Sequence, residues 1–129
     1  MKKNIIVIMT VLITLCLSAC GSNNSNNQTI IFEQRVNDQY LSIIWEDREY
    51  VPYCAINPKN RGTYLGYLKD EPQEEIYEFD GYSSGEWLID YLNMGFGGGE
   101  AMLFKEISVQ DIPDGFYSEY DWNNVLGEE

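Results

Sequence analysis

Short apolar stretches alternate with short polar ones through residues 29–68, which is the pattern of a sheet rather than of long helices. In Tyr40–Trp45, the side chains of Leu41, Ile43 and Trp45 occupy every second position. This period of two predicts a strand with one buried face. We expect further strands at Thr29–Phe32, Tyr50–Ile56 and Thr63–Leu68.

Proline, glycine and acidic residues interrupt the pattern. Pro52 lacks an amide donor, so we expect its strand to lie at an edge of the sheet or to carry a bulge near its start. Asn57–Gly62 predicts a turn, and Gly66 indicates a bend in the strand that follows. Asp70–Glu75 predicts an acidic loop that leads into a short strand at Ile76–Phe79.

The clearest helix signal lies at Ser84–Asn93. Ser83 and Glu86 have the S-x-x-E spacing of a capping box, and Tyr82 precedes the cap in position to pack on the first helical turn. Gly95 suits the left-handed residue that ends a helix. The apolar residues that share one helical face are Trp87, Leu88, Tyr91 and Leu92.

The last strand and the connections complete the expected fold. Gly95–Gly99 predicts a mobile loop, and the unbroken apolar stretch in Ala101–Ile107 predicts a central strand. Short connections between successive strands favour antiparallel pairing. We therefore expect an α+β fold: a small, β-rich single domain, mostly an antiparallel curled sheet or a partly open barrel, with one short helix.

The amino terminus has a different pattern. Two lysines follow Met1, and Ile5–Ala19 is then apolar for fifteen residues apart from three hydroxyl side chains. A membrane-spanning helix needs about 20 apolar residues. The shorter run, with small residues at its end, is typical of a secretory signal.

Leu17-Ser18-Ala19-Cys20 resembles the bacterial lipobox. The resemblance implies that residues 1–19 are a lipoprotein signal peptide and that the thiol of Cys20, the new first residue, carries the lipid. Two or more acyl chains make such an anchor stable. Residues 21–28 contain only Gly, Ser, Asn and Gln, so we interpret 20–28 as the lipidated cysteine and a flexible tether, with the domain at 29–129. A short transmembrane helix with a chance cysteine is the alternative.

Cysteine and charge limit the chemistry of this domain. Cys54 is the one cysteine left after residues 16 and 20, so we expect no disulfide, and we interpret its thiol as a small buried hydrophobe. Residues 29–69 hold five acids and five bases, whereas residues 70–129 hold sixteen acids against Lys105. Such a field repels nucleic acid and favours a cationic or neutral partner of the cell envelope, most simply a protein.

No motif predicts a catalytic residue. Residues 81–85 match G-x-S-x-G, the nucleophile elbow of hydrolases. The chain contains no histidine to act as the base, and Ser83 is better explained as a helix cap. We therefore expect a non-catalytic protein.

Metal and ligand signals are weak. Asp80–Tyr91 starts like a calcium loop but lacks acidic residues at its third and twelfth positions, Tyr82 and Tyr91. A calcium site near Asp111 and Asp114 stays open, but we predict no metal and no cofactor. Neighbouring carboxylates, which could also serve glycoside cleavage, occur at Glu74 and Glu75, at Asp111 and Asp114, and at Glu119 and Asp121. The tyrosines that form either core edges or a stacking platform are Tyr50, Tyr53, Tyr64, Tyr67, Tyr77, Tyr82 and Tyr91.

Three stretches, Trp45–Ile56, Tyr77–Leu92 and Ala101–Asn123, resemble a group of small uncharacterised lipoproteins of Gram-positive bacteria. The resemblance implies one shared domain and a place in the cell envelope, and it carries no activity or site. We expect a protein anchored at the extracytoplasmic face of the cell membrane that binds or modulates another envelope component. The alternatives are a small carboxylate-based enzyme acting on cell-wall material and an immunity or inhibitor-type surface protein.

Overall fold

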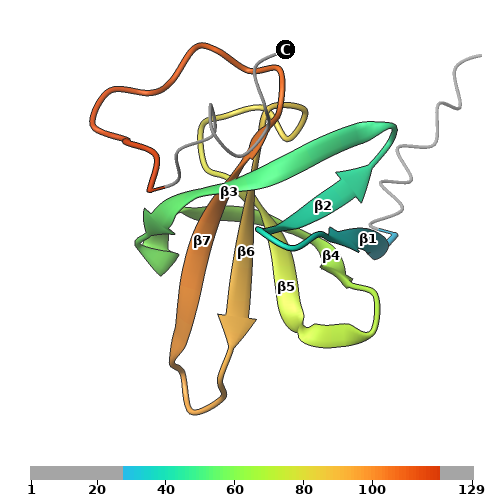
Figure 1. Ribbon diagram of the computed structural model, residues 1–129. Helices are drawn as coiled ribbons and strands as arrows, with labels where there is room; N and C mark the ends of the chain where they lie inside the picture. The colour runs from blue at the N-terminus through green and yellow to red at the C-terminus, as the bar shows by residue number, and fades with distance from the viewer. Residues whose placement is uncertain (1–27, 120–129) are drawn as a thin grey trace, which may run out of the picture.

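Seven strands close into a barrel in the computed structural model, which describes residues 28–119 (Figure 1). Their connections are short, and the only helical element in this range is a single 3-10 turn, η1, at Pro58–Asn60. The strands are β1 (Ile30–Val36), β2 (Leu41–Trp45), β3 (Arg48–Ile56), β4 (Arg61–Leu68), β5 (Glu71–Phe79), β6 (Trp87–Asn93) and β7 (Gly99–Glu106).

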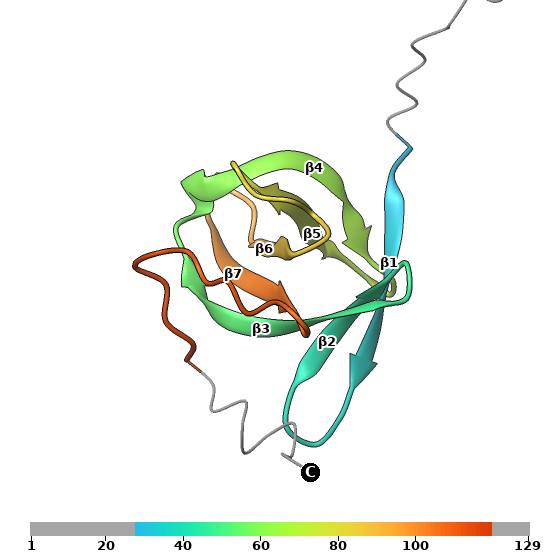
Figure 2. The ribbon, with the colours of Figure 1, turned by 90° about the horizontal axis from the view of Figure 1, so that it is seen from above.

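The strand order around the barrel is β1-β2-β3-β7-β6-β5-β4. Six of the seven contacts are antiparallel, and the parallel pairing of β1 with β4 closes the ring (Figure 2). At this seam Ile30 lies opposite Gly66, where a Cβ atom would collide with the backbone of Ile30. Gly66 therefore permits the close approach of the two strands that closure requires.

The β-rich, mostly antiparallel single domain that the sequence predicts is confirmed, although the barrel is closed rather than partly open. The register of β3 against β7 shifts between Pro52 and Cys54, which confirms the expected bulge. The acidic loop expected at Asp70–Glu75 is wrong, because β5 begins at Glu71. Its turn consists of Lys69 and Asp70, and Asp70 has a φ of 68°.

The helix expected at Ser84–Asn93 is also wrong, because Trp87–Asn93 forms strand β6. Both faces of β6 are buried, so its apolar residues do not alternate with polar ones. Their spacing therefore resembles that of the apolar face of a helix. Ser83 does not cap a helix: its Oγ accepts from the amide of Gly85 at 3.2 Å, and its carbonyl accepts from the amides of Glu86 and Trp87. These bonds form a tight turn before β6.

Two apolar clusters explain why β6 is buried on both sides. Every strand contributes to the first cluster, which therefore fills the barrel: Phe32, Ile43, Tyr50, Leu68, Ile76, Leu88 and Phe104. The second cluster lies on the outer face of β3, β5, β6 and β7: Tyr53, Cys54, Phe79, Trp87, Ile89, Tyr91, Ala101 and Leu103. The segment after β7 covers this outer cluster with Val109, Ile112 and Phe116.

Candidate functional site

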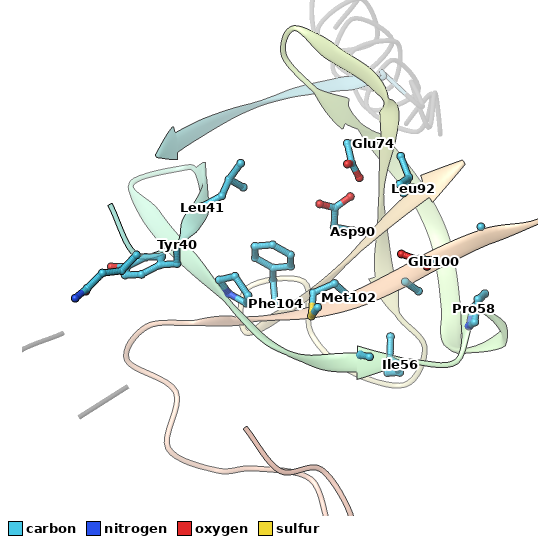
Figure 3. A pocket seen from close by; sticks show the side chains of 15 residues that line it. Tyr40, Leu41, Ile56, Pro58, Glu74, Asp90, Leu92, Glu100, Met102 and Phe104 are labelled. Atoms are coloured by element: carbon cyan, nitrogen blue, oxygen red, sulfur yellow. The ribbon is translucent and has the colours of Figure 1, made fainter. Parts of the chain in front are cut away.

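A cavity of about 750 Å³ opens at the end of the barrel where the β6–β7 hairpin lies (Figure 3). Strands β2, β3, β5, β6 and β7 all contribute to its wall. Most of its lining is apolar, with side chains from Leu41, Pro52, Ile56, Leu92, Met102 and Phe104. The interior cluster ends at this cavity, since Leu41 and Met102 pack against that cluster as well.

Three acidic residues line this largely apolar cavity: Glu74 on β5, Asp90 on β6 and Glu100 on β7 (Figure 3). Asp90 and Glu74 form a pair within it. In the antiparallel register Asp90 lies opposite Ile76 and Glu74 lies opposite Leu92. The two acids are therefore diagonal neighbours on the inward face of the sheet, within reach of each other. Their carboxyl groups lie close enough for a hydrogen bond between them to contribute to the pKa of Asp90.

The cavity changes the protonation of this pair. Burial, the hydrogen bond to Glu74 and the charges of Glu74 and Glu71 together raise the pKa of Asp90 to about 9, with burial the largest cause. Asp90 therefore keeps its proton at neutral pH, and a hydrogen bond between two carboxyls itself requires one proton. Among the described residues, the buried Oδ1 of Asp90 has no hydrogen-bond partner. The pair thus presents one negative charge and one open acceptor.

Within residues 28–119, no Lys or Arg lines the cavity to balance the charge of this pair. The three ion pairs between described residues lie elsewhere: Arg35 with Glu49, Arg48 with Glu46 and Lys69 with Glu33. Asp90 and Glu74 are thus an acidic pair in a largely apolar wall, with no cation from the described part of the chain beside them.

The β6–β7 hairpin extends the site outward. Its loop, expected to be mobile, is joined by hydrogen bonds from the Met94 amide to the Gly98 carbonyl and from the Gly98 amide to the Gly95 carbonyl. Phe96 at its tip is fully exposed and has a φ of 54°, and Met94 is more than half exposed. Leu92 and Glu100, at the base of the same hairpin, line the cavity.

The carboxylates singled out from the sequence are separated by the fold. Glu74 faces the cavity, whereas Glu75 faces away and contacts the hydroxyl of Tyr77 and the amide of Asn93 at 3.4 and 3.3 Å. Glu119 accepts from the Ala55 amide at 3.2 Å. Between residues 28 and 119, no group of three or more Cys, Asp or Glu side chains could hold a metal ion. Cys20 and Asp121 lie outside the described residues.

None of the seven tyrosines singled out from the sequence lines the cavity, whose aromatic residues are Tyr40 and Phe104. The guanidinium of Arg61 lies 3.7 Å from the ring centre of Tyr91 and 4.8 Å from that of Tyr77. Tyr64 meets Tyr77 edge to face, with ring centres 5.4 Å apart. Tyr82 stacks on Phe79 at 4.2 Å and not on the first turn of a helix. Tyr50 and Tyr53 are buried, as core residues are.

Cys54 is a free, buried cysteine, as its place in an apolar strand predicts. Burial raises the pKa of its thiol, and the nearby charge of Glu119 raises it further. The thiol therefore stays protonated and unreactive at neutral pH.

Asp90 is the functional candidate that the sequence did not reveal. In a helix, Asp90 would lie on the polar side, away from Leu88 and Leu92. In a strand, Asp90 lies on the same inward face as these two apolar residues, between them. A charged residue at an inward position of a buried strand is the signal that would have found it.

No family model matches the chain, and neither a curated protein nor a solved structure matches it. Within the described residues, no helix is long and apolar enough to cross a bilayer.

Proposed function

We propose that this protein is a lipid-anchored, extracytoplasmic binding module of the cell envelope, and that its barrel cavity takes a small, largely apolar ligand. The cavity carries the binding part of the proposal. Its volume of about 750 Å³ lies within the range of small-molecule sites, roughly 300–1,000 Å³. Such sites are mostly apolar with a few convergent polar groups, as Asp90 and Glu74 are here.

The anchoring part of the proposal is supported by the sequence Leu17-Ser18-Ala19-Cys20. It is tested by expressing the full chain in a Gram-positive host and labelling cells with a clickable fatty acid. We expect label in the wild type and in Cys54→Ser, and loss of both label and membrane fractionation in Cys20→Ser. A Cys20→Ser protein that still carries label and fractionates with washed membranes would refute the anchor.

The binding part is tested with 2-phenylethanol, a neutral ligand with an apolar ring, titrated into the full chain in nanodiscs of zwitterionic lipid. We expect saturable heat in the wild type. Leu41→Trp, which places an indole in the cavity, should weaken binding at least tenfold, whereas Ile31→Trp on an exposed position should not. Equal affinity in both variants, or no saturable heat in the wild type with either 2-phenylethanol or its amine analogue phenethylamine, would contradict a ligand-binding cavity.

A further inference from the structure

We propose that the cavity selects an organic amine, with the apolar body of the ligand against the barrel wall and its protonated nitrogen against Asp90 and Glu74. This inference rests on the proposed binding function and names the chemical class of its ligand.

The first argument is charge. Even with Asp90 protonated, the carboxylates of Glu74 and Glu100 make the cavity negative, and no cationic side chain among residues 28–119 lines it. A neutral apolar ligand would displace water from this pair and leave its charge uncompensated, which is costly in an apolar site. One ammonium group neutralises one charge, so a monocation fits the pair without a change in its protonation.

The second argument is hydrogen bonding. The Oδ1 atom of Asp90 is buried and lacks a partner among the described residues. An ammonium group offers three donors and no acceptor. It can donate to Oδ1 of Asp90 and to the carboxylate of Glu74 together, whereas a hydroxyl has one proton to donate.

Other ligand charges fit less well. An anion would be repelled by the pair. Calcium prefers six to eight oxygen ligands, and no group of three or more acidic or thiol side chains in residues 28–119 is placed to hold a metal ion. The apolar wall formed by Leu41, Met102 and Phe104 can pack against the carbon body of an organic ligand. These side chains provide no oxygen ligand for a hydrated metal ion.

The experiment compares two probes that share one ring and chain, phenethylamine and 2-phenylethanol. Each is titrated by calorimetry into the full chain in zwitterionic nanodiscs, at pH 7 in phosphate buffer free of other amines. We expect the wild type to bind the amine at least tenfold more tightly than the alcohol. This comparison does not depend on any variant folding correctly.

Three substitutions then separate charge from shape. Glu74→Gln removes the charge while Asp90, still buried, keeps its proton, so the preference for the amine should fall to less than threefold. Asp90→Asn replaces the shared proton with an amide donor and retains a carbonyl oxygen, so the preference should persist. Glu75→Gln is the matched control, one residue along β5 on the opposite face, and should behave like the wild type.

The outcomes distinguish the two proposals. Equal affinity for both probes in the wild type, or a full amine preference in Glu74→Gln, overturns the amine inference and leaves the binding cavity standing. Binding of neither probe overturns the proposed binding function and the inference with it. Amine preference that Glu74→Gln removes and Asp90→Asn and Glu75→Gln keep supports both.

Discussion

Asp90 and Glu74 are diagonal neighbours on adjacent antiparallel strands inside the mouth of the barrel, in a wall that is otherwise mostly apolar. Of the acidic residues between 70 and 119, these two and Glu100 line the cavity. The acidity of this half of the chain therefore supplies the carboxyl groups of the proposed binding site.

The first prediction concerns pH and stability. The pKa of Asp90 is about 9 in the folded protein and 3.8 when unperturbed. The folded state therefore holds a proton that the unfolded state releases, and the stabilisation present below about pH 4 declines as the pH rises toward 9. Linkage gives a slope of about 1 kcal/mol per pH unit from one such group.

Asp90→Asn removes this titration. The free energy of unfolding of Asp90→Asn and of the wild type is measured in urea from pH 5 to pH 10. The value for Asp90→Asn minus the value for the wild type should increase up to about pH 9 and stay constant above it. Glu75→Gln serves as the control and should follow the wild type. A constant difference between Asp90→Asn and the wild type across this range would show that Asp90 is not protonated in the fold.

A second prediction tests closure of the barrel at Gly66. Gly66→Ala brings a methyl group into the backbone of Ile30, so the seam between β1 and β4 must open or shift. We expect a loss of about 3 kcal/mol in the free energy of unfolding, at the upper end of the cost of overpacking. Urea denaturation measures it.

Gly98→Ala provides the comparison, because a Cβ there meets nothing closer than the Gly95 carbonyl at 3.8 Å. It should change stability by less than about 1 kcal/mol. Equal effects of the two substitutions would mean that β1 and β4 do not approach as closely as the seam requires.

A third prediction distinguishes the strand from the helix at residues 87–93. In the helical interpretation Ile89 lies off the apolar face, whereas in β6 it is completely buried in the outer cluster. Ile89→Ala should therefore cost about 2–5 kcal/mol in unfolding free energy. The same change at Ile31, which is 55% exposed, should cost less than about 1 kcal/mol. A small effect at Ile89 would favour the helix.

Alternation predicted the strand at Tyr40–Trp45 well, because Ser42 stands between Leu41 and Ile43 in the sequence, and β2 begins one residue later than expected, at Leu41. Alternation did not identify β6 as a strand, because both of its faces are apolar. Leu88 belongs to the inner cluster, and Trp87, Ile89 and Tyr91 belong to the outer cluster. Burial of both faces removes the polar positions on which the period of two depends.

The cavity could not be predicted from local patterns at all. It exists because β3 pairs with β7 and β1 pairs with β4, contacts between segments far apart in the chain. Glu74 was noted as one of many acids, but its partner Asp90 depended on the secondary structure assigned to residues 84–93. A site built from side chains of two paired strands can be recognised only when the pairing of the strands is known.

A fourth prediction concerns Cys54. Its raised pKa and its burial under the segment after β7 should slow alkylation by iodoacetamide at pH 8 at least tenfold relative to the unfolded chain. Mass spectrometry of the peptide that contains Cys54 measures the rate without interference from other cysteines. Equal rates with and without denaturant would mean that the thiol is accessible in the native protein.

The seam between β1 and β4 also has a mechanical meaning. β1 begins at Ile30, shortly after the segment interpreted from the sequence as a tether, and it joins β4 through three residue pairs. If the chain is held at Cys20, a pulling force between the membrane and a bound ligand acts on the barrel first at Ile30 and its neighbour Gly66. The pairing of β1 with β4 would then separate first. Strands β5, β6 and β7, which carry the carboxyl pair and much of the cavity wall, would separate last.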